Sequence, residues 1–349
     1  MNKYFKESAF ELTATPDAAQ AWCGQASVRT RILRLCRGLK TNQASSIELV
    51  WASLGAGKTH TLLHMQALLT PGSADAVPVF FELPDQPKSF LDFYRRLIDA
   101  MPMDEIAKYI DATPKVRHQD LRKAARVILH GTDVERAQAL DWLAAGHVNL
   151  RDLRSLTGIG SRIEREDDAL RILGASMDAL AANGKRLVLL VDEFQRIASA
   201  NPRHRAGILA CLRTLFNAHP SRLTAVVAVA SKAEVSAREL LSGELSTLIG
   251  ARPLISLPEM DKVEAVTFLR ERLIAFRPAG YIGDAVAPFS EKALETIAEG
   301  VAEMGDKRLI PRPLIQALGI LYERLEEAPG GDPGKLAKKL FAEGESAWE

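Results

Sequence analysis

Two short runs of residues, each following an apolar segment, have the residue types needed for phosphate chemistry. The first begins at Gly55 and follows the apolar run of residues 47–52. A buried strand that stops at a Gly-rich turn and continues as a helix directs backbone N–H groups at an anion. Lys58 would then contact the β- and γ-phosphates of a nucleotide, and the Thr59 hydroxyl would bind Mg²⁺. The residues assigned to cofactor binding are Gly55, Ala56, Gly57, Lys58, Thr59 and His60.

The phosphate-loop pattern is matched with one change, because Ala52 stands where its first Gly is expected. The alternatives are a chance Gly-rich turn and a dinucleotide loop of the G-x-G-x-x-G type. His60 occupies the position where the dinucleotide fingerprint needs Gly or Ala, and an apolar helical pattern follows it. Both observations favour the phosphate loop.

The second run is Asp192-Glu193, which follows the continuous apolar segment of residues 187–191. Ligands of open α/β sheets bind at the carboxyl ends of the strands, so both carboxylates would lie at the ligand-binding edge. Asp192 would hold Mg²⁺, and Glu193 would polarise the water that attacks the γ-phosphate. The alternative is a pair of structural capping carboxylates. In a chain that already has a phosphate loop, the catalytic interpretation is favoured.

Apolar segments predict the elements that position these residues. Short apolar runs predict five strands, at about 47–52, 77–83, 186–192, 223–230 and 253–257. Helical patterns separate them, which is typical of a parallel sheet with helices on both faces. We expect Lys58 and the Asp192-Glu193 pair to meet at the tips of adjacent strands of that sheet.

The remaining segments predict further helices and the domain boundaries. Residues 1–45 are interpreted as an N-terminal arm and helix. Phe10 and Trp22 are expected to pack against the core, and the alternative is that the arm lies against the adenine ring of a nucleotide. Residues 46–257 form the nucleotide-binding domain, with a helical insertion at about 102–160 and a turn at Gly158–Gly160. Helices at about 259–276, 289–303 and 312–327 predict a lid over 258–327, and 328–349 is expected to be a tail.

The insertion also has a cluster of basic residues that could contact a nucleic-acid backbone. Asp120 lies within the cluster and acidic residues follow it, so a solvated helix face is an equal alternative. The candidate residues for double-stranded DNA are Lys115, Arg117, Arg122, Lys123 and Arg126.

Composition excludes several classes of protein. The 349 residues are 47% hydrophobic, and 45 Lys+Arg balance 44 Asp+Glu, so no global charge indicates nucleic acid. The three cysteines are widely spaced and predict neither a disulfide framework nor a metal site. The N-terminus has no apolar signal core, and no apolar run approaches about 18 residues. We therefore expect a cytoplasmic protein with no membrane partner.

Together, these motifs and elements resemble an AAA+ P-loop ATPase of the origin-recognition-like group, over about residues 20–325. Within that group the chain is similar to ATP-binding proteins of BREX-type phage-defence systems and to TnsC-type transposition ATPases. The run from Asp141 to Gly146, with a helix leading to the Asp192-Glu193 strand, carries the similarity to the BREX-type proteins.

The resemblance implies ATP and Mg²⁺ as cofactors and assigns four further positions. Ser231 matches sensor 1, where the family usually has Asn or Thr. Arg252 matches the trans-acting arginine finger, with Arg238 as the second candidate, and Arg312 matches sensor 2. Each arginine could instead be an ordinary surface residue. The predicted catalytic residues are Glu193, Lys58, Ser231, Arg252 and Arg312.

The resemblance implies ATP hydrolysis by in-line attack of water, in a ring or filament of identical subunits. The first hypothesis is a DNA-associated motor or regulator in phage defence or mobile-element biology, with a partner protein from the same operon. The alternative is a nucleotide-gated switch or scaffold that does not bind DNA. The group's initiators usually have a winged-helix domain after the lid, and about twenty residues remain here. A small-molecule kinase is a third, weaker possibility.

Overall fold

The computed structural model describes residues 4–41, 45–70, 75–230, 245, 254–304 and 309–343. The chain divides into two compact units, each built from segments that are distant in the sequence. One, the sheet unit, contains Arg34–Trp51 and Leu68–Ile255. The other, the helical unit, contains Met1–Leu33, Ala52–Ala67 and Ser256–Glu349.

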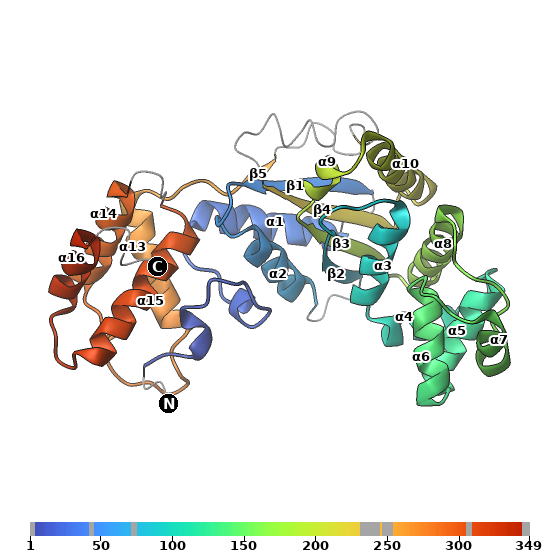
Figure 1. Cartoon of the computed structure of the whole chain (residues 1–349), viewed down its shortest axis with the longest axis horizontal. Helices are drawn as coiled ribbons and strands as arrows, with labels where there is room; N and C mark the ends of the chain where they lie inside the picture. The colour runs from blue at the N-terminus through green and yellow to red at the C-terminus, as the bar shows by residue number, and fades with distance from the viewer. Residues whose placement is uncertain are drawn as a thin grey trace. The chain divides into compact units, whose positions relative to one another are not determined.

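The sheet unit is built on a parallel sheet with strand order β2-β3-β4-β1-β5 (Figure 1). The register pairs β2 with β3 from Ala76↔Arg186 to Glu82↔Asp192, so the carboxyl ends of these strands are level. The five predicted strands are all present, although β5 has only two residues. Their bounds are β1 Ser46–Ala52, β2 Ala76–Glu82, β3 Arg186–Asp192, β4 Leu223–Ala230 and β5 Ile255–Ser256.

The expectation that the phosphate loop and Asp192-Glu193 follow adjacent strands is wrong, because β4 lies between β1 and β3. All seven residues of β3 are buried, as expected for a parallel sheet that is covered on both faces. The mainly apolar sequences of these strands do not identify their neighbours, so the strand order could not be deduced. Because the strands are parallel, β1, β3 and β4 still end at the same edge of the sheet.

Two helices of the sheet unit, α3 and α10, begin at identifiable capping residues. Ser89 and Asp92 form a capping box at the start of α3. Two helices follow β3 in succession, because Asn201 caps a new helix that has Pro202 in its first turn. The bounds are α3 Phe90–Ala100, α8 Glu166–Ala182, α9 Arg196–Ser199 and α10 Pro202–Ala218.

Four helices occupy the predicted insertion, and Figure 1 shows them grouped beside α8. Trp142 is fully buried among them, and its Nε1 donates to the Ser161 carbonyl at 2.8 Å. The predicted turn is confirmed, because Gly158 ends α7 with a φ of 71°. The bounds are α4 Met103–Ala112, α5 Gln119–His130, α6 Asp133–Leu143 and α7 Leu150–Thr157.

The helical unit packs the N-terminal segment against the C-terminal helices (Figure 1). Phe10 stacks on Tyr322 with ring centroids 4.8 Å apart, and the Arg272 Nε donates to the Ala9 carbonyl at 2.6 Å. Phe10 therefore packs in the core of this unit, as expected. The C-terminal helices are α13 Lys262–Ala275, α14 Glu291–Glu303, α15 Pro311–Glu327 and α16 Pro333–Ala342.

Helix α16 lies in the range that was expected to be a tail, and this expectation is corrected. Its Ala337 and Leu340 are fully buried in the core of the helical unit. Asp332 caps its first turn by accepting from Gly334 N at 2.8 Å. The Lys and Glu residues hid a short apolar stripe, which is enough to dock a helix onto existing neighbours.

Candidate functional site

The phosphate loop connects β1 to helix α2 (Lys58–Leu69). Gly55 and Gly57 have φ values of 82° and 95°, a backbone conformation that side chains other than glycine's rarely adopt. Lys58 is buried, and its Nζ donates to the Ser53 carbonyl at 2.9 Å and to that of Ala52 at 3.4 Å. The loop and the first turn of α2 thus have the backbone form of an anion site, with the ammonium group beside it.

Arg312 lies against this loop within the helical unit. Its backbone N donates to the Gly55 carbonyl at 3.3 Å. A Cβ placed on Gly55 would lie 3.1 Å from Arg312 Cβ and 3.5 Å from Ile310 Cδ1. The start of α15 is therefore packed closely onto the loop at Gly55, where a side chain would crowd Arg312, and the predicted sensor 2 residue is beside the predicted phosphate site.

The side chain of His60 is directed at the N-terminal segment. Its Nε2 lies 3.0 Å from the Ala21 carbonyl, and His64 Nδ1 lies 2.7 Å from the Ala19 carbonyl. The Trp22 ring lies 6.0 Å from the His60 ring and 5.2 Å from the His64 ring, between centroids. Burial lowers the pKa of His60 to about 4 and also lowers that of His64. His60 therefore anchors the N-terminal segment to α2, and only its main chain can contribute to the phosphate loop.

The two carboxylates after β3 have different surroundings. Asp192 is buried, with 1% of its surface exposed, and its Oδ1 accepts from Glu193 N at 2.8 Å. Glu193 has a φ of 55°, which is uncommon for a residue other than glycine. The next residue, Phe194, donates its N–H to the Ala228 carbonyl of β4 at 3.0 Å. The chain thus turns sharply at Glu193 while it remains attached to the neighbouring strand, which fixes the carboxylate at the edge of the sheet.

The residues after Glu193 hold its side chain in place, and sequence analysis assigned them no role. Gln195 Nε2 donates to Glu193 Oε2 at 2.7 Å, and Gln195 Oε1 accepts from the Ala230 N–H at 2.9 Å. Arg196 Nε lies 3.7 Å from Glu193 Oε2 and 3.1 Å from Asp85 Oδ1. Glu193 is therefore tied to the end of β4 by Gln195 and to the loop after β2 by Arg196. In the sequence, the only indication of a role for Gln195 and Arg196 is that they lie two and three positions after Glu193.

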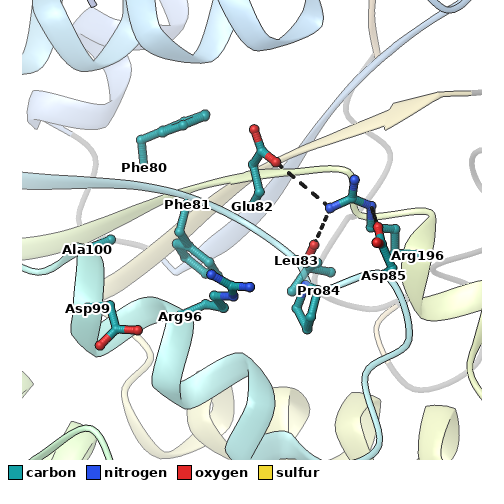
Figure 2. Close-up of a pocket in the computed structure, with 10 residues that line it drawn as sticks. All are labelled: Phe80, Phe81, Glu82, Leu83, Pro84, Asp85, Arg96, Asp99, Ala100 and Arg196. Carbon is teal, nitrogen blue, oxygen red and sulfur yellow. Dashed lines mark hydrogen bonds and ion pairs between the residues drawn. The ribbon is translucent and has the colours of Figure 1, made fainter. Parts of the chain in front are cut away.

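Arg196 also lines a pocket of about 470 Å³ at the carboxyl end of β2 (Figure 2). Its NH1 donates to the Leu83 carbonyl and lies 3.9 Å from Glu82 Oε2. Arg96 projects into the same pocket from α3. The charged residues of the lining are Glu82, Asp85, Arg96, Asp99 and Arg196. The lining has both signs of charge, and Arg196 connects it to Glu193.

The basic cluster of the insertion is partly neutralised by contacts within the chain. Lys123 Nζ lies 3.1 Å from Asp120 Oδ1 and 2.7 Å from the Gly158 carbonyl, and Arg126 Nε lies 3.0 Å from Asp111 Oδ1. The Arg122 Nε is buried without a hydrogen-bond partner in the part of the chain that the structure describes. Lys115 and Arg117 are exposed. The five residues predicted to bind DNA therefore do not form one continuous surface of unpaired positive charge.

Three predicted positions, Ser231, Arg238 and Arg252, lie outside the described residues. Within the described ranges, no group of three or more His, Cys, Asp or Glu side chains could hold a metal ion. None of the described helices has the length and apolar character needed to cross a membrane.

Comparison with known proteins gives one family and several similar folds. Residues 41–238 match the model of the family described as AAA domain. The structure is similar to the ORC2 protein of Aeropyrum pernix (ADPNP-ADP complexes), with a TM-score of 0.58 and 15% identity over 97% of this chain and 72% of that one. The ORC1 protein of Aeropyrum pernix in complex with DNA has a TM-score of 0.51 and 13% identity over 97% and 70% of the two chains.

A third similar structure is the Walker-type ATPase PABY2304 of Pyrococcus abyssi. Its TM-score is 0.51, with 16% identity over 96% of this chain and 75% of that one. The search of curated proteins returned no match. At these identities, the similar structures establish the fold.

Proposed function

The chain belongs to the AAA-domain family, and we propose that it binds Mg-ATP and hydrolyses it. The observation that carries the proposal is the shared sheet edge: β1 leads into the phosphate loop, and β3 ends in Asp192-Glu193 at the same edge. The adenine nucleotides named for the Aeropyrum pernix ORC2 structure support ATP as the nucleotide.

The donor set fits Mg²⁺, which prefers hard oxygen ligands such as the Asp192 carboxylate and the Thr59 hydroxyl. Bound Mg²⁺ would neutralise charge on the phosphate oxygens. Lys58 contacts the β- and γ-phosphates as a point charge, and the glycines let the backbone approach them. Glu193 orients the attacking water and accepts its proton. Gln195 keeps the Glu193 carboxylate in place, because it holds one oxygen at 2.7 Å.

Two substitutions separate binding from hydrolysis. Lys58→Ala should abolish ATP binding in calorimetry, because it removes the cation beside the phosphate loop. Glu193→Gln should keep the ATP affinity of the parent and lose turnover, measured as phosphate release without an added acceptor. ATP affinity in Lys58→Ala equal to that of the parent would contradict the assignment of the loop, and phosphate release only with an added acceptor would indicate a kinase.

The resemblance to the origin-recognition-like group further supports an oligomeric, DNA-associated ATPase in phage defence or mobile-element biology, acting with an operon partner. Arg252, or Arg238, would then complete the site of a neighbouring subunit, and such arginines contribute about 10³–10⁵ in rate. Specific activity should therefore rise steeply with protein concentration. Constant specific activity across a dilution series, with a monomeric species in light scattering, would refute the role of a neighbouring subunit.

One observation favours the alternative, a nucleotide-gated switch or scaffold that does not bind DNA. Lys123 and Arg126, two of the five predicted DNA-binding residues, are already paired with carboxylates of the insertion. The complex of Aeropyrum pernix ORC1 with DNA supports the DNA-associated hypothesis. A DNA titration at several salt concentrations separates the two, because binding to the phosphate backbone must weaken steeply with salt.

A further inference from the structure

Helix α1 (Ala26–Thr41) has more basic residues than any other helix in the described part of the chain. It has five basic residues and no acidic residue, in a chain where the two signs are balanced at 45 and 44. Four of the five are exposed, and the fifth, Lys40, is half-buried. The basic face of α1 consists of Arg29, Arg31, Arg34, Arg37 and Lys40.

The spacing of these residues is unfavourable for the helix itself. From Arg31 to Lys40 a basic residue occurs at every third position, so each one neighbours a like charge on the helix surface. Like-charge pairs at this spacing destabilise a helix by about 0.2–0.5 kcal/mol each. Among the described residues, the side chains of Arg29, Arg34 and Lys40 take part in no ion pair. Internal pairing does not account for these three charges, whereas an external polyanion would.

The opposite face of α1 decides between two kinds of polyanionic partner. Its apolar residues Val28, Ile32, Cys36 and Leu39 are buried, each with at most 4% of its surface exposed. A basic amphipathic helix binds a membrane by inserting its apolar face between the lipids. That face of α1 is already covered, so the basic face must act by charge alone. Binding to a nucleic-acid backbone is dominated by charge and needs no apolar face, so it fits α1 better than membrane insertion does.

We propose that the basic face of α1 binds the phosphate backbone of duplex DNA, with Arg29, Arg34 and Lys40 as its contact residues. At a rise of 1.5 Å per residue, Arg29 and Lys40 are about 16 Å apart along the helix axis. The same length of duplex carries about nine phosphate charges, so several contacts can form at once. The inference rests on the proposed association with DNA and places it on α1 instead of the insertion. The contacts are to phosphates, so no sequence preference is expected.

The test compares two charge-matched variants of the full chain. One combines Arg29→Gln, Arg34→Gln and Lys40→Gln, and the control combines Lys335→Gln, Lys338→Gln and Lys339→Gln at exposed positions of α16. Both lose three positive charges. Affinity for a labelled duplex is measured by fluorescence anisotropy between about 50 and 200 mM salt, where each lost phosphate contact reduces the slope of log K against log salt by about 0.9.

The α1 variant should bind more weakly than the parent, with a slope smaller by about 2–3, and the α16 variant should match the parent. Equal binding by the α1 variant and the parent would overturn the inference, as would an equal loss in both variants. The inference would also be overturned if the α1 variant lost binding to anionic vesicles but bound DNA like the parent. If the triple variant does not fold, Arg34→Glu at one exposed position gives the same comparison.

ATP turnover, measured in parallel, keeps the two proposals distinguishable. None of the six substituted residues belongs to the nucleotide site, so both variants should hydrolyse ATP like the parent. Turnover in the parent without any DNA binding would overturn the α1 inference and leave ATP hydrolysis standing. DNA binding by the parent without ATP turnover would overturn the proposed hydrolysis and leave the α1 inference standing.

Discussion

Gln195 offers the sharpest test of how the proposed catalytic carboxylate, Glu193, is held. Its amide makes two hydrogen bonds, donating to Glu193 Oε2 at 2.7 Å and accepting from Ala230 N at 2.9 Å. Gln195→Ala removes both. A hydrogen bond to a charged group contributes about 1.5–3 kcal/mol. If that contribution acts fully in the transition state, turnover should fall by about 10- to 150-fold, since 1.36 kcal/mol corresponds to a tenfold change in rate.

The expected signature is a lower kcat with unchanged ATP affinity, because Gln195 is not part of the phosphate loop. Steady-state phosphate release gives the first quantity and calorimetric titration gives the second. Asn183→Ala is the matched control: its Nδ2 also makes two hydrogen bonds, to Thr113 Oγ1 at 3.1 Å and the Ala179 carbonyl at 2.8 Å, but at the end of α8. This variant should be less stable and turn over normally when folded.

A kcat for Gln195→Ala equal to that of the parent would refute the reasoning. Equal losses of kcat in Gln195→Ala and Asn183→Ala would show that general destabilisation, and not the orientation of Glu193, is responsible.

Two further predictions follow from the phosphate loop and its helix. Gly55→Ala and Gly184→Ala should each cost about 1–2 kcal/mol of unfolding free energy, since both glycines have positive φ. Only Gly55→Ala should also weaken ATP binding in calorimetry, because the added Cβ lies against Arg312, whereas a Cβ at Gly184 has open space around it. Equal ATP affinities of the two variants would contradict this prediction. Folding lowers the pKa of His60 from about 6.5 to about 4. The free energy of unfolding should therefore keep its full value above about pH 6.5 and decrease by up to about 3 kcal/mol as the pH falls to 4, because the unfolded state binds the proton more tightly. Denaturant unfolding of His60→Gln should lack this part of the pH dependence, and an unchanged profile would count against it.

The strands and the two nucleotide motifs could be predicted because their signals are local. The apolar run before Asp192 and the Gly-rich turn before Lys58 are each contiguous, and the structure has strands at the predicted places. The charged sequence of α16 obscured its packing, since two buried residues, Ala337 and Leu340, are a weak pattern alone.

The contacts between distant segments could not be predicted in the same way. Strand order depends on which buried surfaces fit together, and β1, β3 and β4 are all mainly apolar, so the insertion of β4 between the other two was not encoded in any one segment. The pairing of Arg126 in α5 with Asp111 in α4 likewise depends on the packing of these two helices.

The sequence by itself determined the two motifs from which the chemistry of this protein is proposed: a glycine turn followed by Lys58 and Thr59, and an apolar strand followed by two carboxylates. These depend on residue type and on spacing within a few positions, which backbone geometry converts directly into local structure. The tertiary structure alone decided what surrounds them. It placed Arg312 against Gly55, tied Glu193 to β4 through Gln195, and turned the basic face of α1 outward by burying the opposite one. Such contacts join residues far apart in the chain, and their partners are selected by packing of the whole fold.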